Sequence, residues 1–121
     1  MFQAKKVAFI QYPVTDIARA RRFYERVLGF HTEYQNDQFH WLEYNICGVT
    51  LAITSSVPGQ QPGARGAVLA IEVENLDSTV QELRAKLVPV VTEPFSTPVC
   101  RIAEIADPDG NRICLHQLTD I

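Results

Sequence analysis

The chain contains the same half-domain twice. Residues 9–28 read as a strand, a turn and an amphipathic helix, and residues 68–87 repeat this order 59 positions later (68 − 9 = 59). The ends of the two copies also match, because residues 48–53 (GVTLAI) align with residues 110–115 (GNRICL). An internal repeat constrains the fold more than any single motif, since it fixes how the repeated elements pack and where a concave surface can form.

Each copy predicts a βαβββ module. The strands are expected at about 7–14, 30–36, 39–46 and 49–55, and again at about 67–73, 89–93, 99–106 and 111–118. Residues 55–66 are rich in proline and glycine and read as a linker. The sequence therefore predicts one α+β domain over 1–121. Its two tandem modules, at about 5–54 and 67–119, would form a curved mixed sheet around a cavity, with helices on the outer face.

Both predicted helices carry start signals and apolar stripes. Asp16 and Asn75 are the expected N-caps, and Gly29 is the expected residue after the first helix. The stripes follow helical spacing. Their members are Ile17, Ala20, Phe23, Tyr24, Val27 and Leu28 in the first helix, and Leu76, Val80, Leu83 and Leu87 in the second.

Strand alternation divides the side chains between two faces. One face is apolar and is expected to cover the helices: Ile10, Tyr12, Ile71, Val73, Ile113 and Leu115. The other face mixes polar and apolar groups, as small-molecule pockets do. Its predicted members are Phe9, Gln11, Thr50, Ala52, Val68, Ala70, Glu72, Arg112, Cys114 and His116. Alternation leaves open which face of the strand at 39–46 looks inward, the one with Trp41 and Glu43 or the one with Leu42 and Tyr44.

Charge and cysteine usage exclude several classes of function. The formal charge is 11 − 14 = −3, which argues against nucleic-acid binding, and the arginines at 19, 21, 22 and 26 fit a solvated helix face better than a phosphate-binding patch. No apolar run is long enough for a membrane span or a signal peptide. Three cysteines without CxxC spacing indicate reduced thiols, so we expect a cytoplasmic protein.

Two motifs resemble those of one protein family. Asp16 followed by residues 20–30 (ARRFYERVLGF) is similar to the D…A..FY..vLGf signature of the vicinal oxygen chelate superfamily, and residues 107–113 (DPDGNRI) are similar to its DPDGN.i signature. That superfamily includes glyoxalase I, extradiol dioxygenases, and fosfomycin- and bleomycin-resistance proteins. The resemblance covers nearly the whole chain and is more specific for fold than for chemistry.

The resemblance implies where a divalent metal would bind. Metal-using members hold it with His or Glu on the first and last strands of each half, and these positions become Phe9, Ala52, Val68 and Cys114 here. The first three side chains cannot coordinate a cation, and a catalytic site keeps about three protein ligands. We therefore predict no metal and no other cofactor.

Other residues could rebuild a catalytic site. Glu72 and His116 are candidate catalytic groups that would act as general bases, and Cys114 could join them as a ligand or a nucleophile. The alternative is that His116 binds water at the cavity mouth and that Cys114 is a small buried residue. Glu104 is a further candidate pocket acid.

Three functions follow. The favoured one is a glyoxalase- or bleomycin-resistance-like protein that binds an aromatic or partly apolar small molecule without metal. Its pocket would be lined by Phe9, Gln11, Trp41, Ala52, Val68, Glu72, Arg112, Cys114 and His116. The second is a lyase, isomerase or dioxygenase that uses Glu72, His116 and Cys114, and the third is a structural partner with an empty cavity. The resemblance implies a homodimer, and whether one chain or two close the cavity stays open.

Overall fold

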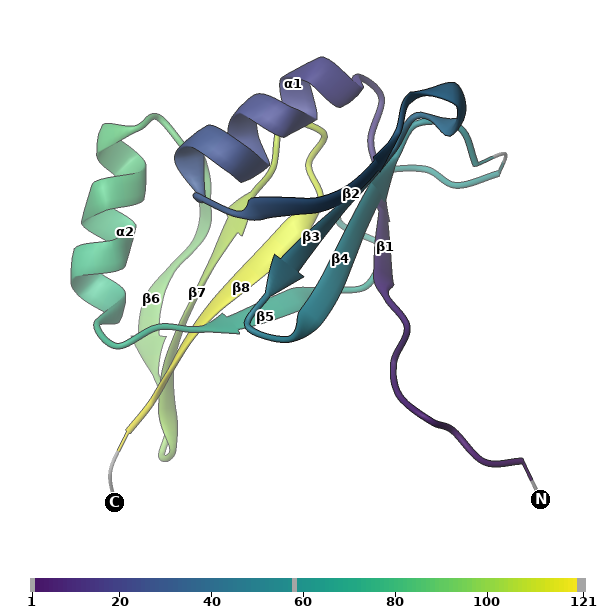
Figure 1. Cartoon of the computed structure of the whole chain (residues 1–121). Helices are drawn as coiled ribbons and strands as arrows, with labels where there is room; N and C mark the ends of the chain where they lie inside the picture. Colours follow the sequence, from purple (N-terminus) through teal and green to yellow (C-terminus); the bar gives the residue numbers. More distant parts are fainter. Residues whose placement is uncertain (1, 58, 120–121) are drawn as a thin grey trace. The chain divides into compact units, whose positions relative to one another are not determined.

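The chain forms two compact units in the computed structural model, which describes residues 2–57 and 59–119. The units are Met1–Pro62 and Gly63–Ile121. Each contains a four-stranded mixed sheet and a helical segment in the order βαβββ (Figure 1). The predicted α+β fold with two βαβββ modules is confirmed, and each module has a sheet of its own.

The first unit places its first strand beside its last. It consists of β1 (Ile10–Pro13), α1 (Ile17–Arg21), the π-helix η1 (Arg22–Val27), β2 (His31–Asn36), the 3₁₀ turn η2 (Asp37–Phe39), β3 (Trp41–Ile46) and β4 (Val49–Thr54). The strand order is β1-β4-β3-β2, with β1 parallel to β4 and the other pairs antiparallel. Cys47 (φ 50°) and Gly48 (φ 95°) make the tight turn between β3 and β4.

The second unit repeats this topology. It consists of β5 (Leu69–Glu72), α2 (Leu76–Ala85), β6 (Val90–Ser96), β7 (Cys100–Ala106) and β8 (Arg112–Leu118). The strand order is β5-β8-β7-β6, and β5 is parallel to β8. Among the described residues of 55–66, none lies in a helix or strand, and Pro58 of the predicted linker falls outside the described residues.

The predicted helix signals are confirmed. The Asp16 side chain accepts a hydrogen bond from the Arg19 N–H, and Asn75 accepts one from Ser78 N–H. Gly29 takes φ 76° directly after the first helical segment, as its predicted position requires. The first helix departs from expectation in its second half, where residues 22–27 widen into a π-helix.

Several sequence predictions fail at the ends of elements. Residues 7–9 and 14, predicted as part of the first strand, lie outside β1, and residues 67, 68 and 73 lie outside β5. Leu87 does not belong to the apolar stripe of α2, because the helix ends at Ala85 and the Leu87 side chain is 90% exposed at φ 63°. Leu76, Val80 and Leu83, the other predicted members of that stripe, are buried.

The core of each unit lies between the helix and one face of the sheet. In the first unit Tyr24 stacks on Tyr44 at 5.9 Å, and both rings are fully buried beside Leu51 and Ile53. In the second unit the buried residues of α2 face Ile113 and Leu115 of β8. Burying one such side chain contributes roughly 1.5–3 kcal/mol.

The DPDGN motif is a hydrogen-bonded turn between β7 and β8. The buried Asp107 carboxylate accepts N–H bonds from Asp109 and Asn111 and a further bond from the Asn111 side-chain amide. Asn111 Oδ1 in turn accepts the Gly63 N–H, which attaches the start of the second unit to the turn. The motif therefore fixes the loop that leads into β8.

No helix among the described residues is long and apolar enough to cross a membrane.

The register of α2 can be tested with two leucines that the sequence does not distinguish. Leu83→Ala should lower the free energy of unfolding by about 3 kcal/mol, because it leaves a cavity in the core. Leu87→Ala should change it by less than about 0.5 kcal/mol, because that side chain is exposed. Urea unfolding of both variants measures the difference, and equal losses would contradict the observed end of the helix.

Candidate functional site

The register of the first sheet separates a covered face from an open one. Residues paired across neighbouring strands point to the same side. Tyr44 pairs with Leu51, and its hydroxyl donates to Glu25 of the π-helix at 2.9 Å, so this side is the helix side. Glu43 pairs with Ala52, which pairs with Gln11 of β1. These three residues therefore lie on the face turned away from the helix.

The open face of the first sheet carries an aromatic pair. Phe9, just before β1, meets the Trp41 ring edge-on, with centroids 5.3 Å apart and planes at 89°. Trp41 also donates its indole N–H to Glu43 Oε2 at 2.8 Å. Gln11 Nε2 donates to Gln60 Oε1 at 2.7 Å, whereas Ala52 is fully buried between its neighbours. The structure thus assigns Trp41 and Glu43 to the open face, which the sequence left undecided.

The open face of the second sheet carries the polar candidates. Ala70 pairs with Cys114, and Glu72 pairs with His116. Arg101 and Gln117 mark the opposite, helix side, because they bond to Asp77 and to the Leu76 N–H of α2. Val68 is 46% exposed, and Phe9 in the first unit is 42% exposed. The predicted open-face residues of this unit, Val68, Ala70, Glu72, Arg112, Cys114 and His116, all have accessible surface.

Glu72 and His116 form a hydrogen-bonded pair. His116 Nδ1 lies 2.6 Å from Glu72 Oε1, and the Leu118 N–H donates to Glu72 Oε2 at 2.7 Å. The bond from Leu118, and then the one from His116, lower the pKa of Glu72, so this carboxyl is ionised at neutral pH. The ionised carboxylate accepts the proton on Nδ1, so Nε2 is the ring nitrogen that Glu72 does not engage.

Cys114 stands apart from this pair. Its thiol makes a weak contact with the Leu115 carbonyl at 3.7 Å, whereas His116 is engaged by Glu72. Burial, followed by the nearby charge of Glu104, raises the pKa of Cys114. A thiol that stays protonated is a poor nucleophile. The structure therefore brings Glu72 and His116 together and does not join Cys114 to them.

The residues present do not fit the metal site that the resemblance implies. Ala52 is fully buried without a donor atom, and Phe9 and Val68 offer only carbon. Within the described chain, no group of three or more His, Cys, Asp and Glu side chains is arranged to hold a metal ion. Cys114 would supply one ligand, whereas a catalytic metal site needs about three protein ligands.

Glu43 is an open-face residue that sequence reasoning did not assign to the pocket lining. It holds the same place as Glu104 in the repeat, because Glu43 pairs with Ala52 where Glu104 pairs with Cys114. Glu104 Oε1 accepts the Thr92 hydroxyl at 2.9 Å, much as Glu43 accepts the Trp41 N–H. Aligning the third strands of the two modules would have identified the pair, at an offset of 61 (104 − 43 = 61) rather than 59.

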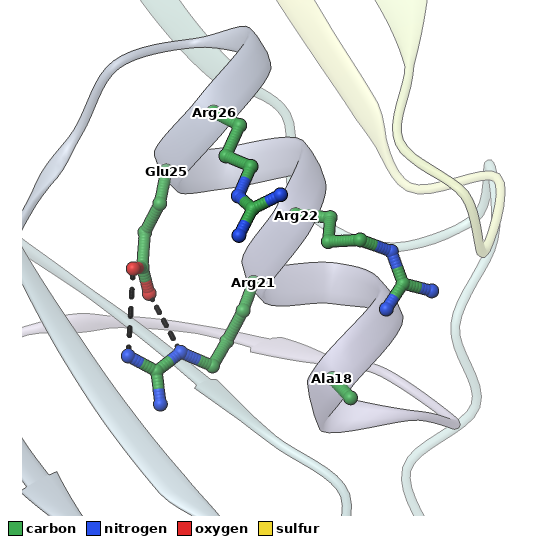
Figure 2. A pocket seen from close by; sticks show the side chains of 5 residues that line it. All are labelled: Ala18, Arg21, Arg22, Glu25 and Arg26. Atoms are coloured by element: carbon green, nitrogen blue, oxygen red, sulfur yellow. Dashed lines mark hydrogen bonds and ion pairs between the residues drawn. The ribbon is translucent and has the colours of Figure 1, made fainter.

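A separate hollow lies along the first helix. It encloses about 260 Å³ and is lined by Ala18, Arg21, Arg22, Glu25 and Arg26 (Figure 2). Arg21 Nε donates to Glu25 Oε2 at 2.9 Å, and Arg22 extends away from this pair. Burial would raise the pKa of Glu25, but the bonds from Arg21 and Tyr44 outweigh it and hold that pKa below its ordinary value. Arg22 and Arg26 are exposed, as a solvated helix face requires.

Comparison with known proteins identifies the family. The model of the Glyoxalase/Bleomycin resistance protein/Dioxygenase superfamily matches residues 6–115. The chain therefore belongs to this superfamily. No curated protein sequence matches the chain.

Solved structures agree with the family. The chain is similar to TnmS3, an antibiotic binding protein from Streptomyces sp. CB03234, with 27% identity, a TM-score of 0.84, and coverage of 98% of this chain and 100% of that one. It is also similar to a glyoxalase/bleomycin resistance protein from the same Streptomyces, with 29% identity, a TM-score of 0.75, and coverage of 90% and 97%. A family member from Nocardioides shares the fold at 18% identity, with a TM-score of 0.81 over 99% of this chain and 87% of that one.

The state of the Cys114 thiol can be measured by alkylation. In a Cys47→Ser background, the iodoacetamide rate of Cys114 should rise with pH to a midpoint above the ordinary thiol value of about 8.5. Glu104→Gln should lower this midpoint, because it removes the neighbouring charge, whereas the remote Glu82→Gln should not. A midpoint below about 8.5 in the Cys47→Ser protein would show an activated thiol and contradict this description.

Proposed function

We propose that the protein binds a small organic molecule on the open faces of its sheets, without a metal ion. The observation that carries this proposal is the set of side chains at the family's metal positions, where Phe9, Ala52 and Val68 offer no donor atoms. TnmS3, one of the similar structures, is described as an antibiotic binding protein. An aromatic or partly apolar ligand suits the predicted lining, because the exposed ring of Phe9 and the side chain of Val68 favour apolar contact.

The contributions of the predicted site residues differ. Phe9, Gln11 and Trp41 would contact the ligand from the first sheet, above the buried Ala52. Val68, Glu72, Arg112, Cys114 and His116 are the predicted contacts on the open face of the second sheet. We further propose that the protein works as a cytoplasmic homodimer, since its strand edges need a partner or cover and its described cysteines are free. Sedimentation equilibrium that gives the mass of a single chain would exclude the dimer.

Binding can be tested with two antibiotics. Bleomycin and the planar aromatic antibiotic doxorubicin are titrated calorimetrically, and mass spectrometry then examines the recovered compound. We expect at least one to bind with a Kd of about 1 µM or tighter and to be recovered unchanged. Gln11→Arg should weaken binding at least about tenfold, because it places a long cation on the open face of β1, and a 1.4 kcal/mol loss is tenfold.

The control is Leu87→Arg, the same new side chain at an exposed position beyond α2. It should leave the affinity unchanged. No binding of either compound, or equal effects of the two arginine variants, would contradict the proposed function.

One observation favours a second candidate function, catalysis by proton transfer. The Glu72–His116 pair could abstract a proton from an acidic C–H or O–H, with Glu72 orienting the imidazole and His116 Nε2 acting as the base. The hemithioacetal of glutathione and methylglyoxal tests a glyoxalase-like lyase activity. Turnover in the wild type that His116→Asn abolishes would support this function, and absence of turnover would exclude it for that substrate class.

A further inference from the structure

We propose that Trp41 and Glu43 form a subsite that selects a planar aromatic ligand bearing a cationic amino group. This inference rests on the proposed small-molecule binding and names the chemistry of the ligand. It assigns the selection to Glu43, a residue outside the predicted pocket lining. The indole ring is held by two neighbours, the carboxylate beside it has no cationic partner within the described chain, and a matching carboxylate recurs in the second module.

The Trp41 ring is fixed by two neighbours before any ligand arrives. Glu43 holds its N–H at 2.8 Å, and Phe9 packs edge-on against its ring at 5.3 Å. A ring fixed in this way loses little conformational freedom when a flat ligand stacks on it, which favours binding. Ala52, paired with Gln11 and Glu43, is fully buried, so the accessible surface here belongs to Phe9, Trp41 and Glu43.

Glu43 brings a negative charge that the protein does not balance. One carboxylate oxygen accepts the indole N–H, and within the described chain no lysine, arginine or histidine side chain contacts the carboxylate. Its open-face neighbours Gln11 and Thr54 are neutral. Covering a half-buried carboxylate with a ligand costs free energy unless the ligand supplies a donor or a cation. An ammonium group would bond the second oxygen and also be attracted to the face of Trp41.

The second module presents the same arrangement. Glu104 stands at the matching register position, has one oxygen held by the Thr92 hydroxyl, and likewise has no cationic partner within the described chain. A carboxylate held by one donor therefore recurs on both open faces. The aromatic wall does not recur, because Ile102 replaces Trp41 at the equivalent position. The aromatic subsite is thus assigned to the first module.

Trp41 makes the test direct, because it is the single tryptophan of the chain. The probes are 9-aminoacridine, a planar cation at neutral pH, and acridine-9-carboxylate, an anion with the same ring system. We expect 9-aminoacridine to quench Trp41 fluorescence saturably and to bind at least about tenfold tighter than the carboxylate. Glu43→Gln should weaken 9-aminoacridine about tenfold, the loss expected for one charge-assisted hydrogen bond.

The matched control is Glu82→Gln, which removes the same charge from an exposed position on α2. It should leave both affinities unchanged, and urea unfolding should show that Glu43→Gln remains folded. Trp41→Phe, followed by calorimetry, should weaken both probes. Equal affinities for the two probes, no binding of either, or a Glu43→Gln protein that binds 9-aminoacridine as well as Glu82→Gln would overturn the subsite.

Failure of the subsite and failure of the proposed function give different results. If bleomycin or doxorubicin binds and Gln11→Arg weakens it while Glu43→Gln does not, small-molecule binding stands and the charge selection is wrong. If neither antibiotic binds and neither acridine quenches Trp41, both proposals fail.

Discussion

The pairing of the first strand of each module with its last strand determines which side chains form the core and which lie on the open face. Gln11 lies opposite Ala52, and Ala70 lies opposite Cys114. Because side chains alternate along a strand, a slip of one residue would turn every apolar side chain of β4 or β8 from the core to the open face. The observed register instead buries residues such as Ile53 and Ile113 completely and leaves Phe9 and Val68 exposed. The core and the proposed binding surface are therefore two results of one set of hydrogen bonds.

The two modules share this register but differ in what they present. In the first, two aromatic rings and a carboxylate held by Trp41 offer a rigid apolar wall with one charge. In the second, the Glu72–His116 pair offers a proton acceptor, and the Cys114 thiol is kept neutral by burial and by the charge of Glu104. The proposed binding function relies most on the first module, and the catalytic alternative on the second. Duplication allows such division, because each sheet has its own core and can change its open face independently.

Much of the fold could be predicted because its signals are local. Asp16 and Asn75 cap the helices as expected, and two-residue alternation assigned Tyr12 and Ile113 to the core. Features that depend on tertiary pairing could not be predicted. The strand with Trp41 and Glu43 has aromatic and polar groups on both faces, so only its pairing with β4 decides which side is open. Leu87 continues the helical spacing of Leu83, yet α2 ends before it. Pro89 signals that a helix end is near but does not fix whether Leu87 lies inside the helix. Glu43 was not assigned because its counterpart Glu104 lies at a different offset from that of the first strands.

The most direct test of metal-free binding is elemental analysis of freshly purified protein, followed by ligand titration before and after treatment with EDTA. Phe9, Ala52 and Val68 have no donor atoms for a metal, so we expect far less than one nickel, zinc, iron or manganese ion per chain. The Kd of the ligand should be the same before and after EDTA. A near-stoichiometric metal ion whose removal abolishes ligand binding would contradict it.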